Sequence, residues 1–443
     1  MEIVQNIKVE RMAYGSFAIA CDENGKTLFV EGGVPGDVVN AQVLESKKNF
    51  TRVKVVEVMQ ASEFRNSNPE LIQAAATGAN WAHLTYDYQL QAKRENVISA
   101  LVRTAKIHPE TAQGVVRNCI ASKREIGYRN KIELACIKDL MGKLQLGFTE
   151  EGTGEFRSTT SAPLAHNAIA KAPKALAGAL RYLQGCDDLG IFRVGLRHSV
   201  RTKDTEIALW TTPGAFPRAV VANTLRSAVK ATSIVRVMSQ PGAKREVKGV
   251  EQLYGKGYWE EELCGLRFKT SAPAFFQVNT AGAEKLIDAA IAGLDLPEGA
   301  IVADLYAGGG TFSLALSKVA NYVYAVESFG PSVKDLRRNC DINNISNVEV
   351  IGGDSARELP TLGNLDALVV DPPRSGLAAC VPTDIAAALP KKIAYISCDP
   401  ATMARDIARF IDCGFTLESV QPVDMFPQTY HVECVAMMSR VKK

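Results

Sequence analysis

Apolar and polar residues alternate in short runs over the first part of the chain. Lys26–Val30, Asp37–Val43 and Thr51–Val58 each have the period of two that is typical of a β-strand. Turn-forming residues at 22–25 and 32–37 separate these runs. Short strands at this spacing predict a small β-barrel, and such barrels commonly hold single-stranded nucleic acid. The spacing by itself supports the barrel and not a nucleic-acid partner.

The pattern changes in the last part of the chain, where continuous apolar runs alternate with helix-like stretches. The apolar runs lie at 301–306, 322–326, 348–351, 366–370 and 393–397, and 312–320 and 331–343 are helix-like. This alternation predicts an α/β domain with a parallel sheet and right-handed crossovers. Two further runs, at 415–423 and 432–439, predict a hairpin at the edge of that sheet.

The middle of the chain has a mixed pattern that does not specify a fold. It predicts one helix over residues 86–103 and β-like stretches at 129–134 and 233–238, with a boundary near 264–273. We therefore divide the chain into a barrel (1–62), a mixed α+β central domain (63–269) and an α/β domain (270–443).

The composition excludes several classes of protein. Of the 443 residues, 47% are hydrophobic and 22% are charged, which is typical of a globular chain. No apolar run approaches the roughly 18 residues that cross a bilayer, and no export signal is visible at the N-terminus. The ten cysteines show no CxxC spacing, so we expect reduced thiols. We expect a cytoplasmic protein and set aside the membrane, secreted and disordered classes.

The net charge of +3 hides an uneven distribution. Residues 63–269 carry 30 Lys and Arg against 20 Asp and Glu. Residues 1–62 carry 7 against 8, and residues 270–443 carry 14 against 20. A basic segment between acidic ones fits a polyanion-binding surface. Taken alone, this charge is explained better by a solvated surface rich in lysine.

A glycine-rich turn follows the first apolar run of the α/β domain. Gly308, Gly309 and Gly310 allow the backbone to approach a ligand and to turn sharply into a helix. Glu327 lies 19 residues after Gly308, where a carboxylate can accept hydrogen bonds from a ribose diol. Ser313 replaces the last glycine of the dinucleotide fingerprint. The turn favours a nucleoside-bearing cofactor over a dinucleotide, and the alternative is a turn without a ligand.

Asp371 ends the fourth apolar run and is followed by Pro372 and Pro373. Prolines donate no ladder hydrogen bond, so this pair cannot extend the sheet. We expect a stiff exit that holds Asp371 at the carboxyl edge, where open α/β folds bind ligands. Asp-Pro-Pro is equally often an ordinary strand terminator.

Cys398 follows the fifth run and precedes a predicted helix. Asp399 suits the N-cap of that helix and Pro400 its first position, and the helix runs towards residues 413–414. The positive partial charge at a helix N-terminus favours the thiolate and raises its reactivity. The commoner interpretation of a cysteine at a strand end is packing.

Glu433 opens a largely apolar run, where an unpaired carboxylate is costly. It is either a general base or a charge on an edge strand, and the run alone favours neither. His431, two residues earlier, is expected to be a structural hydrogen-bonding residue.

Four motifs occur in a fixed order in the last region. They are Asp-Leu-Tyr-Ala-Gly-Gly-Gly-Thr-Phe (304–312), Asp-Pro-Pro-Arg-Ser-Gly (371–376), Ser-Cys-Asp-Pro-Ala-Thr-Met-Ala-Arg-Asp (397–406) and Phe-Pro-Gln-Thr-Tyr-His-Val-Glu (426–433), and Phe-Phe-Gln-Val-Asn (275–279) precedes them. Together they resemble the RNA uracil-C5 methyltransferases, which make 5-methyluridine in ribosomal and transfer RNA with S-adenosylmethionine. The resemblance is close over 270–443 and looser at 128–131 and over the N-terminal barrel, which is similar to a TRAM domain.

This resemblance implies a Rossmann-like class I S-adenosylmethionine-dependent methyltransferase domain. It also implies that the OB-like TRAM barrel and the basic central domain bind RNA. It implies Cys398 as the nucleophile and Glu433 as the base. The positions that match the family's cofactor site are Gln277, Tyr306, Thr311, Glu327, Asp354 and Asp371. Thr311 replaces the more usual Asn, and Asp371 is also expected to orient the uracil.

The reaction needs these residue types. C5 of uracil is a poor nucleophile towards a methyl sulfonium, but adding a thiolate at C6 gives C5 carbanion character. A base must then remove the C5 proton before the thiolate can leave. The uracil must also leave its stack, which is easier in a single-stranded loop.

The chain departs from the family at one place. Many members hold an iron–sulfur cluster with four cysteines, two of them in a Cys-Gly-Gly-Cys element before the helix that here contains Gln89. This chain has Ala-Thr-Gly-Ala-Asn-Trp-Ala-His at 76–83, and Ala162 stands where a further cysteine is expected. We therefore expect no iron–sulfur cluster and no other metal.

We expect 23S ribosomal RNA as the substrate, because the three-part layout with an N-terminal barrel is that of the ribosomal branch. Transfer RNA stays open as an alternative. A cytosine-C5 enzyme would use a related thiol, but Asp371 with Glu433 downstream fits uracil better. A catalytically idle RNA-binding protein would be expected to lack Cys398 or Glu433, and both are present. The sequence gives neither the target uridine nor the oligomeric state, for which we expect a monomer.

Overall fold

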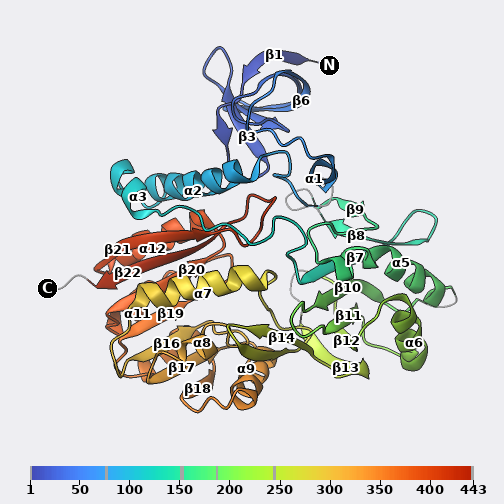
Figure 1. Ribbon diagram of the computed structural model, residues 1–443, viewed down its shortest axis with the longest axis vertical. Helices are drawn as coiled ribbons and strands as arrows, with labels where there is room; N and C mark the ends of the chain where they lie inside the picture. Colours follow the sequence, from blue (N-terminus) through green and yellow to red (C-terminus); the bar gives the residue numbers. More distant parts are fainter. Residues whose placement is uncertain (1, 75–77, 150–153, 186–187, 243–245, 441–443) are drawn as a thin grey trace. The chain divides into compact units, whose positions relative to one another are not determined.

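The computed structural model describes residues 2–74, 78–149, 154–185, 188–242 and 246–440 (Figure 1). The chain forms two compact units. Unit 1 comprises Met1–Glu125, Pro373–Gly376 and Ile396–Met438, and unit 2 comprises Ile126–Pro372, Leu377–Tyr395 and Ser439–Lys443. None of the described helices combines the length and hydropathy that a membrane span requires.

Unit 1 begins with six strands in one curled sheet. They are β1 (Ile3–Lys8), β2 (Arg11–Met12), β3 (Phe17–Cys21), β4 (Thr27–Glu31), β5 (Val38–Ser46) and β6 (Phe50–Gln60). Their order is β1-β5-β6-β4-β3-β2, and β1 also contacts β3, so the sheet curls back on itself. Alternate residues such as Ala18, Leu28 and Val30 are buried in its core, as the period of two predicts. The predicted small barrel is confirmed.

Helices and strands from two distant parts of the sequence complete unit 1. They are α1 (Pro69–Ala74), α2 (Tyr86–Arg103), α3 (Pro109–Val115), α12 (Pro400–Asp412), β21 (Phe415–Val423) and most of β22 (Glu433–Arg440). Helix α2 packs against α12, and the segment after α3 pairs with β21 through Val116 and Ile120. Strands β21 and β22 are neighbours, as the last two apolar runs predict.

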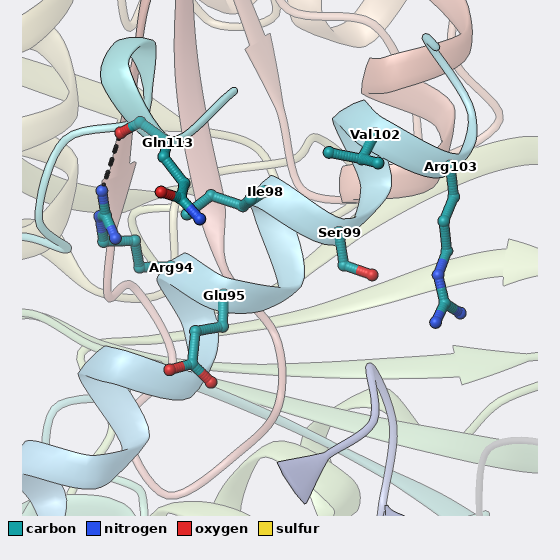
Figure 2. Close-up of a pocket in the computed structure, with 7 residues that line it drawn as sticks. All are labelled: Arg94, Glu95, Ile98, Ser99, Val102, Arg103 and Gln113. Carbon is teal, nitrogen blue, oxygen red and sulfur yellow. Dashed lines mark hydrogen bonds between the residues drawn. The ribbon is translucent and has the colours of Figure 1, made fainter. Parts of the chain in front are cut away.

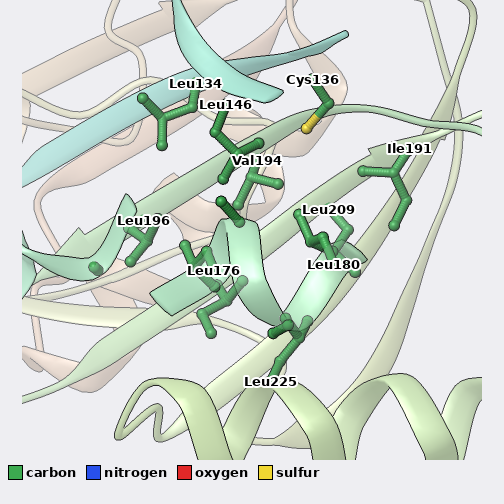
Figure 3. Packing of buried hydrophobic residues seen from close by; sticks show 14 of the residues in the cluster. Leu134, Cys136, Leu146, Leu176, Leu180, Ile191, Val194, Leu196, Leu209 and Leu225 are labelled. Atoms are coloured by element: carbon green, nitrogen blue, oxygen red, sulfur yellow. The ribbon is translucent and has the colours of Figure 1, made fainter. Parts of the chain in front are cut away.

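Unit 2 begins with a mixed sheet that carries helices. Its strands are β7 (Lys131–Lys138), β8 (Leu144–Thr149), β9 (Phe156–Ser158), β10 (Ile191–His198), β11 (Thr205–Thr211), β12 (Ser233–Ser239) and β13 (Val247–Gly255), in the order β13-β12-β11-β10-β7-β8-β9. The helices are α4 (Asn167–Ala170), α5 (Ala172–Leu183) and α6 (Arg218–Ala228). Figure 3 shows Leu176, Leu180 and Leu225 of these helices packed with Leu134 and Leu209 of the sheet. A short hairpin, β14 (Trp259–Leu263) and β15 (Leu266–Thr270), follows.

The rest of unit 2 has the predicted α/β alternation. Its strands are β16 (Ile301–Leu305), β17 (Tyr322–Glu327), β18 (Val348–Gly352), β19 (Ala367–Val370) and β20 (Lys392–Ser397). The helices are α7 (Thr280–Leu294), α8 (Ser313–Leu316), α9 (Gly330–Ile342), α10 (Ser355–Glu358), a 3₁₀ turn (Leu359–Thr361) and α11 (Val381–Ala387). The strands run parallel in the order β18-β17-β16-β19-β20. The predicted parallel sheet is confirmed.

One predicted helix, 312–320, is shorter in the structure. Helix α8 covers only Ser313–Leu316. The next backbone N–H groups, those of Lys318 and Val319, donate to carbonyls three residues back. The segment therefore continues as tight turns that lead into β17.

Candidate active site

The glycine-rich turn after β16 leaves an open surface. Gly308 and Gly310 have φ of +57° and +95°, in the region that favours glycine. A Cβ on Gly310 would clash with the ends of the Leu314 and Leu336 side chains, so a larger residue would have to displace them as well as adopt this φ. A Cβ on Gly308 would meet nothing within 4 Å. The turn is tightly packed at Gly310 and open at Gly308.

Glu327 holds this turn from the end of the neighbouring strand. Its carboxylate accepts the backbone N–H of Gly308 at 2.8 Å and that of Phe329 at 2.6 Å. The side chain is half-buried. The sequence places Glu327 correctly at the end of β17, and these two bonds fix the orientation of its carboxylate.

Two carboxyl groups lie at the ends of adjacent strands beside the turn. Asp304 of β16 is fully buried and accepts a hydrogen bond from the Ser313 hydroxyl, while its Oδ1 has no partner among the described residues. Burial raises the pKa of Asp304 to about 7; the Ser313 bond opposes this rise, and the charges of Asp371 and Glu327 add to it. Burial also raises the pKa of Asp371 to about 7. Both groups therefore resist ionisation more than ordinary carboxyls do.

Sequence reasoning missed Asp304. An acid within an apolar run is the same signal that drew attention to Glu433, and Asp304 stands inside the run at 301–306. The proline pair after Asp371 follows the end of β19, so the predicted exit from the sheet lies where the sequence placed it.

Gln277 lies in a loop that is held by Asn130, the residue before β7. The side chain of Gln277 is buried. Asn130 donates to the carbonyl of Gln277 at 2.9 Å and to the Thr280 hydroxyl at 3.0 Å, and its own N–H donates to the carbonyl of Val278 at 2.8 Å. Asn279 caps α7 by accepting the N–H of Gly282. The loosely matched 128–131 segment thus supports the Gln277 loop.

The other candidate cofactor residues differ in their surroundings. Tyr306 directly follows β16 with φ of +65°, which is unusual for a residue with a side chain. Tyr306 and Thr311 are both half-buried. Asp354 is exposed, and its carboxylate accepts the N–H groups of Ala356 and Arg357 as the N-cap of α10. These three residues lie at the turn after β16 and at the end of β18, all in unit 2.

Cys398 lies in unit 1, on a short segment with many hydrogen bonds. The Ser397 hydroxyl accepts the N–H of Asp399 at 3.2 Å and donates to the Asp399 carbonyl at 3.1 Å. Asp399 accepts the N–H of Thr402 at 2.8 Å, and Pro400 opens α12. The predicted N-cap and the predicted proline position are confirmed. Cys398 itself is half-buried at the N-terminal end of this helix.

A residue of the barrel also contacts this segment. The hydroxyl of Tyr14 donates to the carbonyl of Cys398 at 3.2 Å. Burial raises the pKa of Tyr14 far above its usual range, and the charges of Asp399 and Cys398 raise it further. Sequence reasoning missed Tyr14, because no local pattern marks a contact across 384 positions.

The charges of Glu433 and Cys398 both raise the pKa of the buried Cys434 thiol. Glu433 opens β22 and is only 7% exposed, which disfavours a simple solvent-facing charge. The pKa of Cys434 is raised well above its usual range by burial first, and then by charges that include those of Glu433 and Cys398. Cys398 and Glu433 thus both belong to unit 1, and burial disfavours the thiolate of Cys434.

The loop before Glu433 is anchored by α2. Lys93 and Asp424 form a fully buried ion pair at 2.5 Å, and Asp424 also accepts the Tyr86 hydroxyl at 2.9 Å. Gln89 donates to the Gln428 side chain at 3.0 Å and accepts the Gln428 N–H at 2.9 Å. The path of residues 424–432 is therefore fixed from one side by a single helix.

The structure describes only part of residues 76–83, where we expect no cysteine ligands of an iron–sulfur cluster. Ala76 and Thr77 lie outside the described residues, while Ala79, Trp81 and Ala82 are buried, as is Ala162. In the described ranges, no group of three or more His, Cys, Asp or Glu is placed to hold a metal ion. The absence of an iron–sulfur cluster stays a prediction.

A groove of about 390 Å³ lies on α2 and α3 (Figure 2). Its lining is Arg94, Glu95, Ile98, Ser99, Val102, Arg103 and Gln113. Arg94 donates to the carbonyls of Gln113 and Val116, so it joins the two helices. No candidate catalytic or cofactor residue lines this groove.

Comparisons with known proteins agree with these features. Two family models match the chain: TRAM domain at residues 3–56, and tRNA (uracil-5-)-methyltransferase at residues 263–441. An uncharacterized RNA methyltransferase of Lactobacillus johnsonii is 32% identical and covers 99% of each chain. One of Gloeobacter violaceus is also 32% identical and covers 98% of this chain and 96% of the relative.

A solved structure has the same fold over nearly the whole chain. It is the Pyrococcus abyssi tRNA (uracil-54, C5)-methyltransferase in complex with S-adenosyl-L-homocysteine. The TM-score is 0.74 at 24% sequence identity, and the match covers 98% of this chain and 99% of that chain.

Proposed function

Because the chain belongs to the RNA uracil-5-methyltransferase family, we propose that it transfers a methyl group from S-adenosylmethionine to C5 of a uridine in ribosomal RNA in the cytoplasm. The observation that carries this proposal is the setting of Cys398. This half-buried thiol stands at the capped N-terminal end of α12, in the same unit as the buried Glu433. The C5 reaction requires both a nucleophile and a base.

The residues of unit 2 fit S-adenosylmethionine. The unpartnered, buried Oδ1 of Asp304 and the open surface at Gly308 leave polar capacity and space beside the glycine-rich turn. The carboxylate of Glu327 is already oriented there and retains acceptor capacity for a ribose diol. We propose that the cofactor is held by Gln277, Tyr306, Thr311, Glu327, Asp354 and Asp371. When bound, S-adenosylmethionine supplies an electrophilic methyl group on sulfur.

We assign the nucleophilic step to Cys398. Its sulfur forms a bond to C6 of the uracil, and the C5–C6 π electrons move to give C5 carbanion character. The positive end of the α12 dipole stabilises the thiolate before the attack. C5 then takes the methyl group, and the electron pair of the broken methyl–sulfur bond stays with the departing sulfur. Asp371 orients the uracil during this step.

We assign the elimination step to Glu433. Its carboxylate takes the proton from the methylated C5, and the released electron pair re-forms the C5–C6 double bond. The Cys398 sulfur leaves C6 with the pair of the broken bond and is a thiolate again. The anchoring of residues 424–432 by Lys93 and Gln89 supports this role, because it fixes the approach to Glu433.

The substrate assignment rests on the layout of the chain. We propose that the barrel (1–62) and the basic central domain (63–269) bind RNA and that residues 270–443 carry the reaction. This layout favours ribosomal RNA. Transfer RNA is the second candidate, because the matching family model and the solved structure are both named for it.

The test uses methyl-labelled S-adenosylmethionine with separate transcripts of 23S ribosomal RNA and transfer RNA. Nuclease digestion and mass spectrometry then locate any 5-methyluridine. We expect label in the ribosomal transcript. Label only in transfer RNA would favour the second candidate, and label in neither RNA, with the full-length protein folded, would contradict the proposed activity. Mapping 5-methyluridine in RNA from cells that lack the protein identifies the position.

A further inference from the structure

The turn between β2 and β3 of the barrel is anchored to a buried tryptophan. Trp81 is fully buried and donates from its indole N–H to the carbonyl of Gly15 at 2.8 Å. The backbone N–H of Trp81 donates to the carbonyl of Gln428. Trp81 therefore joins the barrel turn to the loop that leads to Glu433.

Tyr14, next to Gly15 in this turn, is oriented by aromatic packing. Its ring meets that of Tyr430 edge to face, with the ring centroids 5.3 Å apart and an interplanar angle of 82°. Tyr430 packs against the core of the barrel, and its N–H donates to Asn80 at 3.3 Å. The position of the Tyr14 ring thus depends on the barrel and on the 424–432 loop.

The hydroxyl of Tyr14 also binds the segment 397–399, which we call the nucleophile segment. Ser397 binds the N–H and the carbonyl of Asp399, and the Asp399 carboxylate caps α12. These bonds fix the segment on either side of Cys398. The bond from Tyr14 to the Cys398 carbonyl comes from a distant part of the sequence. Because burial holds the pKa of Tyr14 far above neutral pH, the hydroxyl keeps its proton and stays a donor.

From this geometry we infer that Tyr14 is a positioning residue for the methyl-transfer reaction: its hydrogen bond to the Cys398 carbonyl sets the peptide plane from which the thiol attacks C6. The inference rests on the proposed role of Cys398. It gives the barrel a part in the reaction in addition to binding RNA. A small displacement of a nucleophile slows its attack strongly, because the reacting atoms must be aligned within a fraction of an ångström.

The test is Tyr14→Phe, which removes the hydroxyl and retains the ring that packs on Tyr430. The matched control is Tyr88→Phe. Tyr88 packs face to face on Phe64 in the same barrel core, with the ring centroids 4.5 Å apart. Both variants are mixed with RNA that contains 5-fluorouridine at the target position, together with S-adenosylmethionine. Fluorine at C5 cannot leave as a proton does, so the covalent protein–RNA adduct accumulates and its formation rate reports the attack by sulfur.

We expect Tyr14→Phe to slow adduct formation about tenfold, the effect of one hydrogen bond, with an unchanged Kd for RNA, KM for S-adenosylmethionine and melting temperature. We expect Tyr88→Phe to form the adduct at the wild-type rate. Equal rates for wild type and Tyr14→Phe would overturn the positioning role while leaving the proposed function intact. A wild-type protein that forms no adduct would instead overturn the proposed role of Cys398. A purely structural role of Tyr14 would lower the melting temperature without a separate effect on the rate.

Discussion

At the scale of single residues, position decides which groups can react. Cys434 and Cys398 are both cysteines of unit 1, yet burial raises the pKa of Cys434 so far that it stays protonated. Cys398 instead stands half-buried at the N-terminal end of α12. The capping pattern, Asp399 followed by Pro400, predicted the helix after Cys398, and the family resemblance implied its role as nucleophile. Asp304 was missed, although its burial in an apolar strand is equally unusual.

Cys398→Ala should abolish methyl transfer, because no sulfur is left to add to C6. RNA affinity should stay close to that of wild type, since one small side chain changes. Transfer of labelled methyl groups and filter binding measure the two properties. Cys413→Ala, just after the other end of α12, is the control and should remain active. Full turnover by Cys398→Ala would rule out covalent catalysis by this residue.

Glu433→Gln should accumulate a covalent protein–RNA species, because the amide has the size of the carboxylate but takes no proton from C5. A denaturing gel would show this species as a shifted band that resolves slowly. Wild-type protein should show far less of it under the same conditions. Normal turnover without a shifted band would assign the base to another group.

Asp304→Asn should change the pH dependence of stability. In the folded protein the pKa of Asp304 is raised to about 7, whereas in the unfolded chain it is near 4. Between these values the folded state holds a proton that the unfolded state has lost, so this group makes stability fall as the pH rises. From pH 5 to pH 8, wild type should lose about 2 kcal/mol relative to Asp304→Asn. Denaturant unfolding at both pH values measures this, and parallel curves would contradict it.

At the scale of elements, the candidate catalytic residues depend on α2, which contributes none of them. This helix holds the 424–432 loop through an ion pair and a pair of glutamine hydrogen bonds. The sequence predicts α2 at 86–103 with the observed bounds. It does not predict what α2 contacts, because Lys93 looks like any surface lysine until its partner Asp424, 331 positions away, is known.

Lys93→Met should lower the free energy of unfolding by about 3 to 5 kcal/mol, because it leaves Asp424 charged and buried. The double variant Lys93→Met, Asp424→Asn removes that charge and keeps the hydrogen-bond acceptor, so it should recover part of the loss. Chemical denaturation measures both. The control is Lys47→Met, which breaks an exposed pair with Glu45 and should change stability by less than about 1 kcal/mol. Equal effects of the buried and exposed substitutions would contradict this account.

At the scale of the whole molecule, local patterns in the sequence predicted the barrel and the parallel sheet. They did not predict contacts between residues that are far apart in the sequence. The apolar runs identified β16, β19 and β20 because inner strands of a parallel sheet are buried on both faces. The period of two identified β4, β5 and β6 because one face of a barrel strand is exposed. The contacts of Asn130 with the Gln277 loop and of Tyr14 with Cys398 join sites 147 and 384 positions apart. Such contacts depend on the complete fold and leave no periodic signal.

Unit 1 is built from residues near both ends of the sequence, and this has a consequence for synthesis on the ribosome. The first 125 residues emerge long before Ile396–Met438, so α2 must wait for the segment that neutralises Lys93. A nascent chain can complete the strands of unit 2 first, since domains fold as units during translation. The contact of Tyr14 with the Cys398 carbonyl can likewise form only after residue 398 has been synthesised. Until Asp424 has been synthesised, the nascent chain therefore lacks the carboxylate that pairs with Lys93 of α2.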